Sequence, residues 1–125
     1  MKTYSTIEQI NADIVDGVLT VEDDVTFKVS FSIDASIRVE GDIKASDIKA
    51  WNIHARDINA LDINARDIHA LNINAFDINA SDINALDISF YAVCFAYTAL
   101  VCKSIVGRRE NNKYFCLDSE VIIKN

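Results

Sequence analysis

Isoleucine recurs at every fifth position through the middle of the chain, and this spacing predicts a coil rather than a straight element. The row consists of Ile43, Ile48, Ile53, Ile58, Ile63, Ile68, Ile73, Ile78, Ile83 and Ile88. In an α-helix, a step of five residues turns about 140° and scatters these side chains around the axis. In a flat strand, each step would move the side chain to the opposite face. A backbone that turns a corner every five residues buries the whole row, so the pattern predicts a β-solenoid of stacked coils.

The other positions of the five-residue unit are also regular. Asp or Asn precedes each isoleucine, and alanine follows two positions later from Ala45 to Ala85. The pairs Asp47-Ile48 and Asn52-Ile53 resemble the central pair of the pentapeptide-repeat family, whose small residue stands two positions before the large one instead of after it. The resemblance implies an all-β fold, a right-handed quadrilateral β-solenoid, in which four units or twenty residues complete each coil.

The segments that flank the repeat predict two caps within a single domain. Residues 1–41 form an N-terminal cap and first irregular coil, residues 42–107 the solenoid, and residues 108–125 a C-terminal cap. Ser5-Thr6-Ile7-Glu8 has capping-box spacing, and Ile10 and Ile14 follow at helical intervals, which predicts a short helix over one end. The alternating apolar residues 25–33 are compatible with a hairpin to residues 18–21 or with an irregular coil.

Beyond Ile88 the five-residue spacing continues with a shift of two positions, which predicts one more coil. Its inward residues are expected to be Phe90, Phe95, Leu100 and Ile105. The outward residues of this coil are apolar as well: Tyr91, Val93, Ala96, Ala99 and Val101. A continuous apolar surface is normally covered. We expect either the tail, through residues 114–117 and 121–123, or a second copy of the chain to cover it, and both can do so together.

Acidic residues predominate in the body of the chain, which has a net charge of -7. Residues 42–88 contain eight acidic and four basic residues, whereas residues 89–125 contain three acidic and five basic ones. With twenty residues in a coil, the aspartates are predicted to stack in three columns: Asp42, Asp62 and Asp82; Asp47, Asp67 and Asp87; and Asp57 with Asp77. The fourth side would be neutral, with Asn52 and Asn72 beside Trp51, Leu71 and Tyr91.

Regular rows of carboxylates on a rigid rod resemble the phosphates of DNA, and they could occupy the basic cleft of a DNA-binding protein. Some pentapeptide-repeat proteins act as DNA mimics on gyrase-type topoisomerases, and phage-borne anti-CRISPR inhibitors of CRISPR nucleases offer a further analogy. The first hypothesis is therefore a non-catalytic DNA mimic that inhibits or protects a nucleic-acid enzyme. The partner-binding residues would be Asp47, Asp57, Asp62, Asp67, Asp77, Asp82 and Asp87.

The second hypothesis is a structural or assembly module that self-associates, as a dimer, or binds a protein through its neutral apolar face. The residues of that face would be Trp51, Leu71, Tyr91, Phe90, Phe95 and Val101. Salt separates the two hypotheses, because contacts between charged surfaces weaken with ionic strength and apolar contacts do not.

Catalytic chemistry finds little support in the sequence, and we expect no enzyme, cofactor or metal site. The chain has no Gly-rich phosphate loop or nucleophile elbow. His54 and His69 are expected to be solvated and apart on the coil, and Gly107-Arg108-Arg109 to form a solvated turn. The three cysteines lack paired spacing, which indicates reduced and mostly buried thiols in a cytoplasmic protein. Neither a signal peptide nor a membrane span is expected, nor direct binding of nucleic acid.

Overall fold

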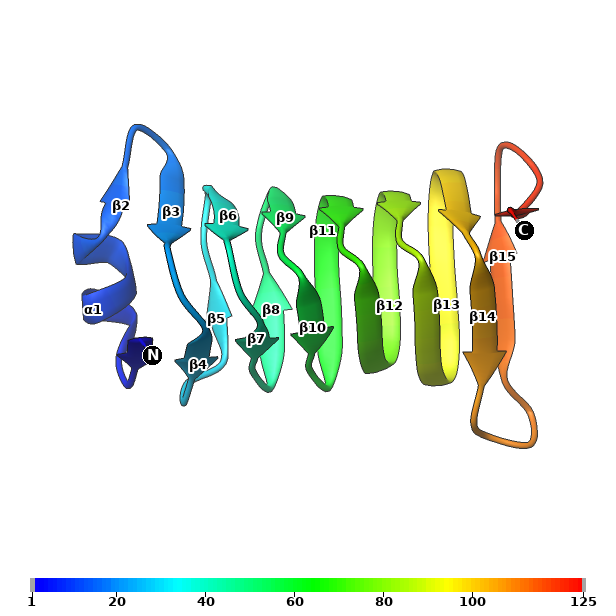
Figure 1. Cartoon of the computed structure of the whole chain (residues 1–125), viewed down its shortest axis with the longest axis horizontal. Coiled ribbons are helices and arrows are strands. Elements are labelled where there is room, and N and C mark those ends of the chain that lie inside the picture. The colour runs from blue at the N-terminus through cyan, green and yellow to red at the C-terminus, as the bar shows by residue number, and fades with distance from the viewer. Residues whose placement is uncertain (1, 125) are drawn as a thin grey trace.

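The chain winds into a β-solenoid of about six turns in a computed structural model that describes residues 2–124 (Figure 1). One short helix lies at the N-terminal end, and the two chain ends lie at opposite ends of the long axis. Met1 and Asn125 lie outside the described residues. Among residues 2–124, no helix is long and apolar enough to span a membrane.

Sixteen strands and one helix make up the described chain. The N-terminal elements are β1 (Lys2–Tyr4), α1 (Ile7–Ala12), β2 (Ile14–Val15), β3 (Val18–Val21), β4 (Val25–Phe27), β5 (Phe31–Ser32) and β6 (Ser36–Val39). The repeat forms β7 (Ile43–Lys44), β8 (Asp47–Lys49), β9 (Asn52–His54), β10 (Asp57–Asn59), β11 (Asp62–His69) and β12 (Asn72–Asn84). The last elements are β13 (Asp87–Cys102), β14 (Ser104–Gly107), β15 (Lys113–Cys116) and β16 (Ile122–Ile123).

Each regular coil contains fifteen residues and three sides, so the predicted coil of twenty residues and four sides is wrong. Ile58 pairs in parallel with Ile43 on one side and with Ile73 on the other, and Ile63 pairs with Ile48 and Ile78. The five-residue period fixes the length of a side but not the angle of a corner. The small alanine at each corner allows the backbone to turn more sharply, and three sides then close the coil.

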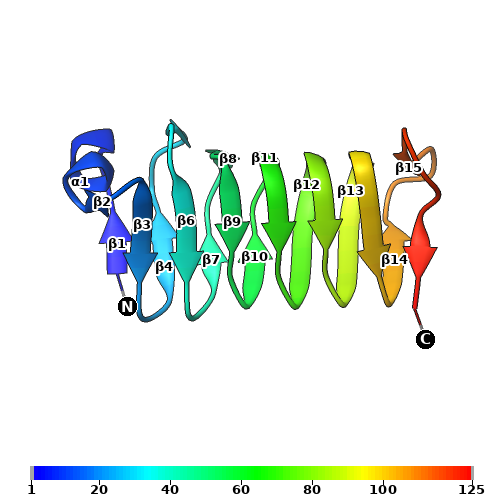
Figure 2. The same cartoon turned by 90° about the horizontal axis from the view of Figure 1, so that it is seen from above.

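The three sides form three parallel faces, which we name by their inward columns. The first face has Ile43, Ile58, Ile73 and Ile88. The second face has Ile48, Ile63, Ile78 and Cys94. The third face has Ile53, Ile68, Ile83 and Leu100. Figure 2 shows the same stack of coils from a second side, with the strands lying side by side from one end of the solenoid to the other.

The interior is entirely apolar among the described residues. Isoleucines of the repeat are at most 2% exposed, and the corner alanines from Ala50 to Ala85 are also buried. Burying an isoleucine contributes about 2 kcal/mol, so the repeat row is the main source of stability. The backbone ladder continues around the corners, where the Leu61 N–H donates to the Ser46 oxygen (2.8 Å) and the Phe76 N–H to the Leu61 oxygen (2.8 Å).

At the N-terminal end, the predicted helix is confirmed but its cap lies one residue later. Thr6 accepts a hydrogen bond from the Gln9 N–H, and the Gln9 side chain accepts from the cap backbone, so the capping box is Thr6 to Gln9 rather than Ser5 to Glu8. Ile10 is fully buried beneath the helix. Ile14 lies outside the helix, in β2.

The N-terminal strands form an irregular first coil, as one of the two alternatives predicted. Strand β3 pairs with β6 and β4 pairs with β7, and β3 and β4 do not pair with one another. The antiparallel hairpin joins β2 and β3 instead, across Asp16 and Gly17, which both have positive φ. Two consecutive residues with positive φ are the signature of a tight hairpin turn.

The last regular coil contains two insertions that explain the shifted apolar spacing. Strand β13 contains one extra residue at each of two corners relative to β12, so Ile88 pairs with Ile105 seventeen residues later. As a result Cys94 and Ala96 point inward and are fully buried, whereas Phe95 lies in the outward column and is only partly buried. The prediction that Phe95 points inward and Ala96 outward is therefore wrong.

The tail lengthens the solenoid instead of folding back over its side. Strands β14, β15 and β16 each pair in parallel with β13, one on each face, and form a last turn. The outward side chains of Tyr91 and Val93 on β13 remain exposed by 43% and 39%. The predicted cover over this side is therefore absent among residues 2–124.

Candidate functional site

The aspartates stack in columns, but their partners are fifteen residues apart and differ from those predicted. The second face presents Asp47, Asp62 and Asp77 in one uninterrupted column. The column of the first face is Asp42, Asp57, Asn72 and Asp87, and that of the third face is Asn52, Asp67 and Asp82. In the regular coils only the second face has three successive aspartates, because asparagine interrupts the column of the first face and begins that of the third.

Partial burial, together with the neighbouring carboxylates, raises the pKa of two of these aspartates. Partial burial and the neighbouring charges of Asp47 and Asp77 raise the pKa of Asp62. Partial burial and Asp82 raise the pKa of Asp67. Both shifts oppose ionisation, as expected for like charges about 4.8 Å apart on neighbouring strands.

Several other aspartates take part in hydrogen bonds between coils. Asn72 Nδ2 donates to Asp57 Oδ1 (2.9 Å), and Ser104 Oγ donates to Asp87 Oδ1 (2.8 Å). On the second face, the Val93 N–H donates to Asp77 Oδ1 (3.2 Å). These carboxylates hold coils together, so they have a structural role in addition to any role on the surface.

The predicted neutral face does not exist in the three-sided coil. Asn52 lies on the third face and Asn72 on the first. Trp51, Leu71 and Tyr91 lie at three different corners, and each is about four-tenths exposed. Of the other residues assigned to this face, Phe90 is fully buried, Phe95 packs against Phe115 with ring centroids 4.7 Å apart, and Val101 is partly buried.

An apolar ridge runs along the corner between the first and second faces. Leu61 and Phe76 stack there in successive coils, and the Phe76 ring lies 5.2 Å from that of Tyr91. Arg108 lies over Phe76, 5.7 Å from the ring centroid, and its Nη2 donates to the Ala75 carbonyl oxygen (2.9 Å). Arg108 is therefore fixed against the solenoid and is not a freely solvated turn residue.

The C-terminal end of the solenoid is open and apolar. Each of its strands, β14, β15 and β16, has β13 as its only neighbour among the described residues. Large apolar side chains with at least 40% exposure gather on this last turn: Val106, Tyr114, Phe115, Leu117, Ile122 and Ile123. At the other end, helix α1 lies beyond the first strands (Figure 1). The two ends are therefore unequal, because only the N-terminal end has a helical lid.

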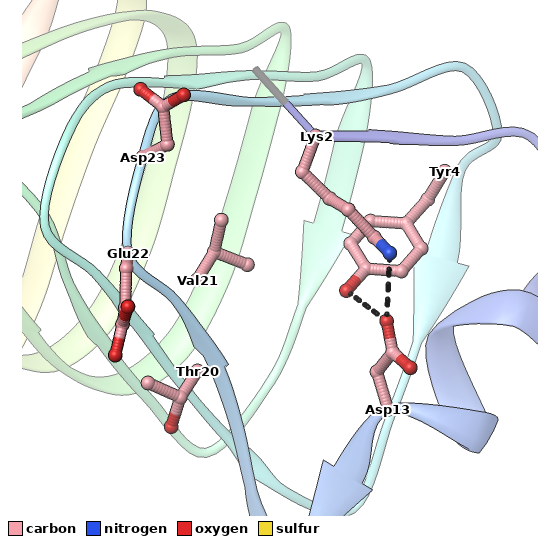
Figure 3. A pocket seen from close by; sticks show the side chains of 7 residues that line it. All are labelled: Lys2, Tyr4, Asp13, Thr20, Val21, Glu22 and Asp23. Atoms are coloured by element: carbon pink, nitrogen blue, oxygen red, sulfur yellow. Dashed lines mark hydrogen bonds and ion pairs between the residues drawn. The ribbon is translucent and has the colours of Figure 1, made fainter.

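A pocket of about 390 Å³ lies at the N-terminal end between β1 and β3, next to the end of α1 (Figure 3). Tyr4 Oη donates a hydrogen bond to Asp13 Oδ2 (2.7 Å), and the same oxygen forms an ion pair with Lys2 Nζ (3.2 Å). Burial raises the pKa of Tyr4 far above its ordinary value, and the bond from Tyr4 lowers the pKa of Asp13. The polar groups of this triad satisfy one another, and they fasten the end of α1 to β1.

Nothing in the described chain resembles a metal or nucleophilic site. Residues 2–124 contain no cluster of three metal-ligating side chains. The three cysteines are unpaired and two of them are buried, as predicted, and burial raises the pKa of Cys94 to about 12. A thiol with so high a pKa is a poor nucleophile near neutral pH.

The chain matches no family model, no curated protein and no solved structure. Function is therefore inferred from the fold and its surfaces.

Proposed function

We propose that this protein is a non-catalytic assembly module that joins a second copy of itself through the open C-terminal end of its solenoid. The observation that supports the proposal most strongly is the coincidence of three unpaired strand edges with an exposed apolar surface on the last turn. Unpaired edges are templates for pairing with another chain, and large exposed apolar surfaces mark contact sites.

A second copy fits this end because a two-fold contact needs only one kind of surface. In such a contact the same residues of both chains meet, and identical edge strands pair in antiparallel order. A head-to-tail contact would instead have to displace α1, whose Ile10 is fully buried. The expected product is therefore a closed dimer and not a growing fibre.

Replacement of exposed apolar residues at this end tests the proposal. Val106 on β14 and Leu117 after β15 are 57% and 61% exposed, so Val106→Asp and Leu117→Asp should leave the monomer folded. Each change places two charges across the two-fold contact and should weaken the dimer at least tenfold. Sedimentation equilibrium over a range of protein concentrations measures the effect.

Val15→Asp is the matched control, because Val15 is equally exposed (67%) but lies at the other end. It should leave the dimer unchanged. Residues 89–125 have a net charge of +2, from five basic and three acidic residues, so added salt should preserve or strengthen the dimer. A protein that is monomeric at all concentrations, or a dimer that both end variants leave intact, would refute the proposal.

Membership of the pentapeptide-repeat family is a further part of the proposal. The five-residue unit with its Asp-Ile or Asn-Ile pair supports it. The coil of three units, instead of the four that the resemblance implies, and alanine after the isoleucine make this chain a divergent member. A structure of a relative with coils of both sizes would establish the connection, whereas relatives with only fifteen-residue coils would point to a separate origin.

The second candidate function is DNA mimicry, which the uninterrupted column of Asp47, Asp62 and Asp77 favours. Charge density argues for ranking it second. Residues 42–88 have a net charge of -4, from eight acidic and four basic residues, over roughly three coils or about 15 Å. Duplex DNA has one charge per about 1.7 Å of axis, roughly twice that density.

Mimicry predicts that this protein inhibits a gyrase-type topoisomerase in a salt-dependent way. In a supercoiling assay, Asp62→Lys should abolish inhibition, because Asp62 lies at the centre of the acidic column. Asp87→Lys, on the first face, is the comparison and should have a smaller effect. Absence of inhibition by the unmodified protein would remove this target, and equal inhibition by Asp62→Lys would exclude the column as the contact.

A further inference from the structure

One arginine and two histidines form an outward column along the third face. Arg38, His54 and His69 occupy equivalent positions on β6, β9 and β11, in directly paired strands. The two imidazole rings stack with their centroids 4.9 Å apart and their planes 2° from parallel. The sequence prediction had separated these histidines, because a twenty-residue coil would place them on different sides.

A groove of about 360 Å³ runs beside this column. Its opposite wall is the corner between the third and first faces, where Arg56 and Leu71 follow Gly41 in successive coils and Glu40 lies next to Gly41. The groove therefore has a guanidinium on each wall, Arg38 on one side and Arg56 on the other. The alanines between the walls are small, and they leave the floor open to a ligand.

The groove has a positive balance in a protein of net charge -7. Among residues 2–124, the side chains of Arg38 and Arg56 form no hydrogen bond or ion pair, and Glu40 is the only carboxylate that lines the groove. Asp67 and Asp82 are on the same face but at its other edge, two positions before His69 and Asn84. Arg66 is at that other edge too and lies over the Trp51 ring.

We propose that this groove binds a phosphate group, either that of an organic monoester or the free inorganic ion. Two guanidinium groups that face a common space suit a tetrahedral oxyanion, because each can donate two parallel hydrogen bonds to its oxygens. The imidazole edges of His54 and His69 supply further N–H donors. Partial burial, then His69, then Arg38 lower the pKa of His54 in the unliganded protein, so a bound anion should raise it.

The proposal is independent of self-association, because the groove lies on the side of the solenoid and not at its end. The test is a titration of the full chain with glycerol 3-phosphate and, separately, with inorganic phosphate, followed by NMR of the histidine ring signals. Both probes should shift the His54 and His69 signals along saturable curves and raise the pKa of His54. Tighter binding of glycerol 3-phosphate would identify an organic ester as the natural ligand, and tighter binding of inorganic phosphate would identify the free ion.

Arg38→Gln and Arg56→Gln should each weaken binding at least tenfold. The control is Arg66→Gln, which removes an equal charge from the opposite edge of the same face and should change affinity less than twofold. Thermal unfolding of each variant without ligand separates loss of binding from loss of fold. Full binding by Arg56→Lys would show that a positive charge at this position is sufficient and that two parallel hydrogen bonds from a guanidinium are not needed. The proposal fails if equimolar chloride reproduces the shifts, if the curves do not saturate, or if Arg66→Gln has the same effect as Arg56→Gln.

Discussion

At the scale of single residues, three positions of the five-residue unit have distinct roles. Isoleucine fills the interior, alanine allows the corner, and the residue before isoleucine faces solvent and interacts along its column. Ile63 illustrates the first task, since it lies midway along the second face and is 2% exposed.

Truncation of Ile63 should therefore be costly. Ile63→Ala leaves a cavity that stacked coils cannot easily close, and we expect a loss of about 2–5 kcal/mol in the free energy of unfolding. Ile63→Val removes a single methylene and should cost about 0.5–1.5 kcal/mol. Urea denaturation measures both values, and an equally small loss in the two variants would show that Ile63 does not lie in a close-packed interior.

Asp62 should destabilise the fold at neutral pH, because its pKa is raised in the folded state. A carboxylate with a raised pKa costs stability above that pKa, and the cost disappears as the pH falls through the raised value to the ordinary 3.8. Asp62→Asn should therefore stabilise the protein at pH 7, by no more than about 1 kcal/mol because solvent screens the repulsion. The advantage should vanish near pH 3.8.

Asp87→Asn is the matched comparison for this effect. Asp87 has Asn72 and Ser104 as its column neighbours instead of carboxylates, and it accepts a hydrogen bond from Ser104. Its replacement should give no stabilisation at pH 7. Urea denaturation at pH 7 and at pH 3.8 covers both variants, and an equal gain for Asp87→Asn would show that overall charge, not the column, is responsible.

At the scale of elements, the corner at Gly41 depends on the absence of a side chain. A Cβ atom at this position would meet the Asp24 carboxylate and lie 2.9 Å from the Asp24 backbone nitrogen. That carboxylate accepts a hydrogen bond from the Asp42 N–H (2.8 Å), which links the first irregular coil to the repeat.

Gly41→Ala should therefore cost about 1–3 kcal/mol, the usual range for inserting a group where there is no space. Hydrogen exchange should reveal where the damage lies, with faster exchange at the Asp42 amide and little change in the coils beyond residue 57. A variant as stable as the parent, with unchanged protection at Asp42, would show that this corner relaxes without cost.

The sequence predicted the side of each coil better than its corners. Ten isoleucines at a fixed spacing required an inward row, and they established the solenoid and its five-residue sides. The angle at each corner depends on how several units pack together inside the coil, and the sequence of one unit does not determine it. The predicted number of sides, four, was therefore wrong. The error then displaced every predicted column, separated His54 from His69, and produced a neutral face that does not exist.

Two local sequence signals correspond to features of the structure that the prediction missed. Asp16-Gly17 between apolar residues is a strong hairpin signal, and it marks the turn between β2 and β3. Gln9 three residues after Thr6 gives the capping box that forms. The two extra residues in β13 could not be located, because a shifted apolar spacing does not reveal at which corner an insertion lies.

At the scale of the whole molecule, the solenoid is a rod with unequal ends and three unequal sides. Helix α1 lies at one end, and at the other end three strands have no outer partner among residues 2–124, which supports self-association. The sides differ because the fifteen-residue coil stacks three successive aspartates on the second face and aligns two histidines with an arginine on the third. Every surface described above depends on that coil length.

Disulfide cross-linking tests the coil length most directly, in a chain with Cys116→Ser so that only the buried Cys94 and Cys102 remain. Asn64→Cys with Asn79→Cys places thiols fifteen residues apart in paired strands, within reach of a disulfide. Asn59→Cys with Asn79→Cys places them twenty residues apart on different faces. Mass spectrometry after mild oxidation should find an intramolecular disulfide in the first pair and two thiols in the second. A disulfide in the second pair and none in the first would contradict the three-sided coil.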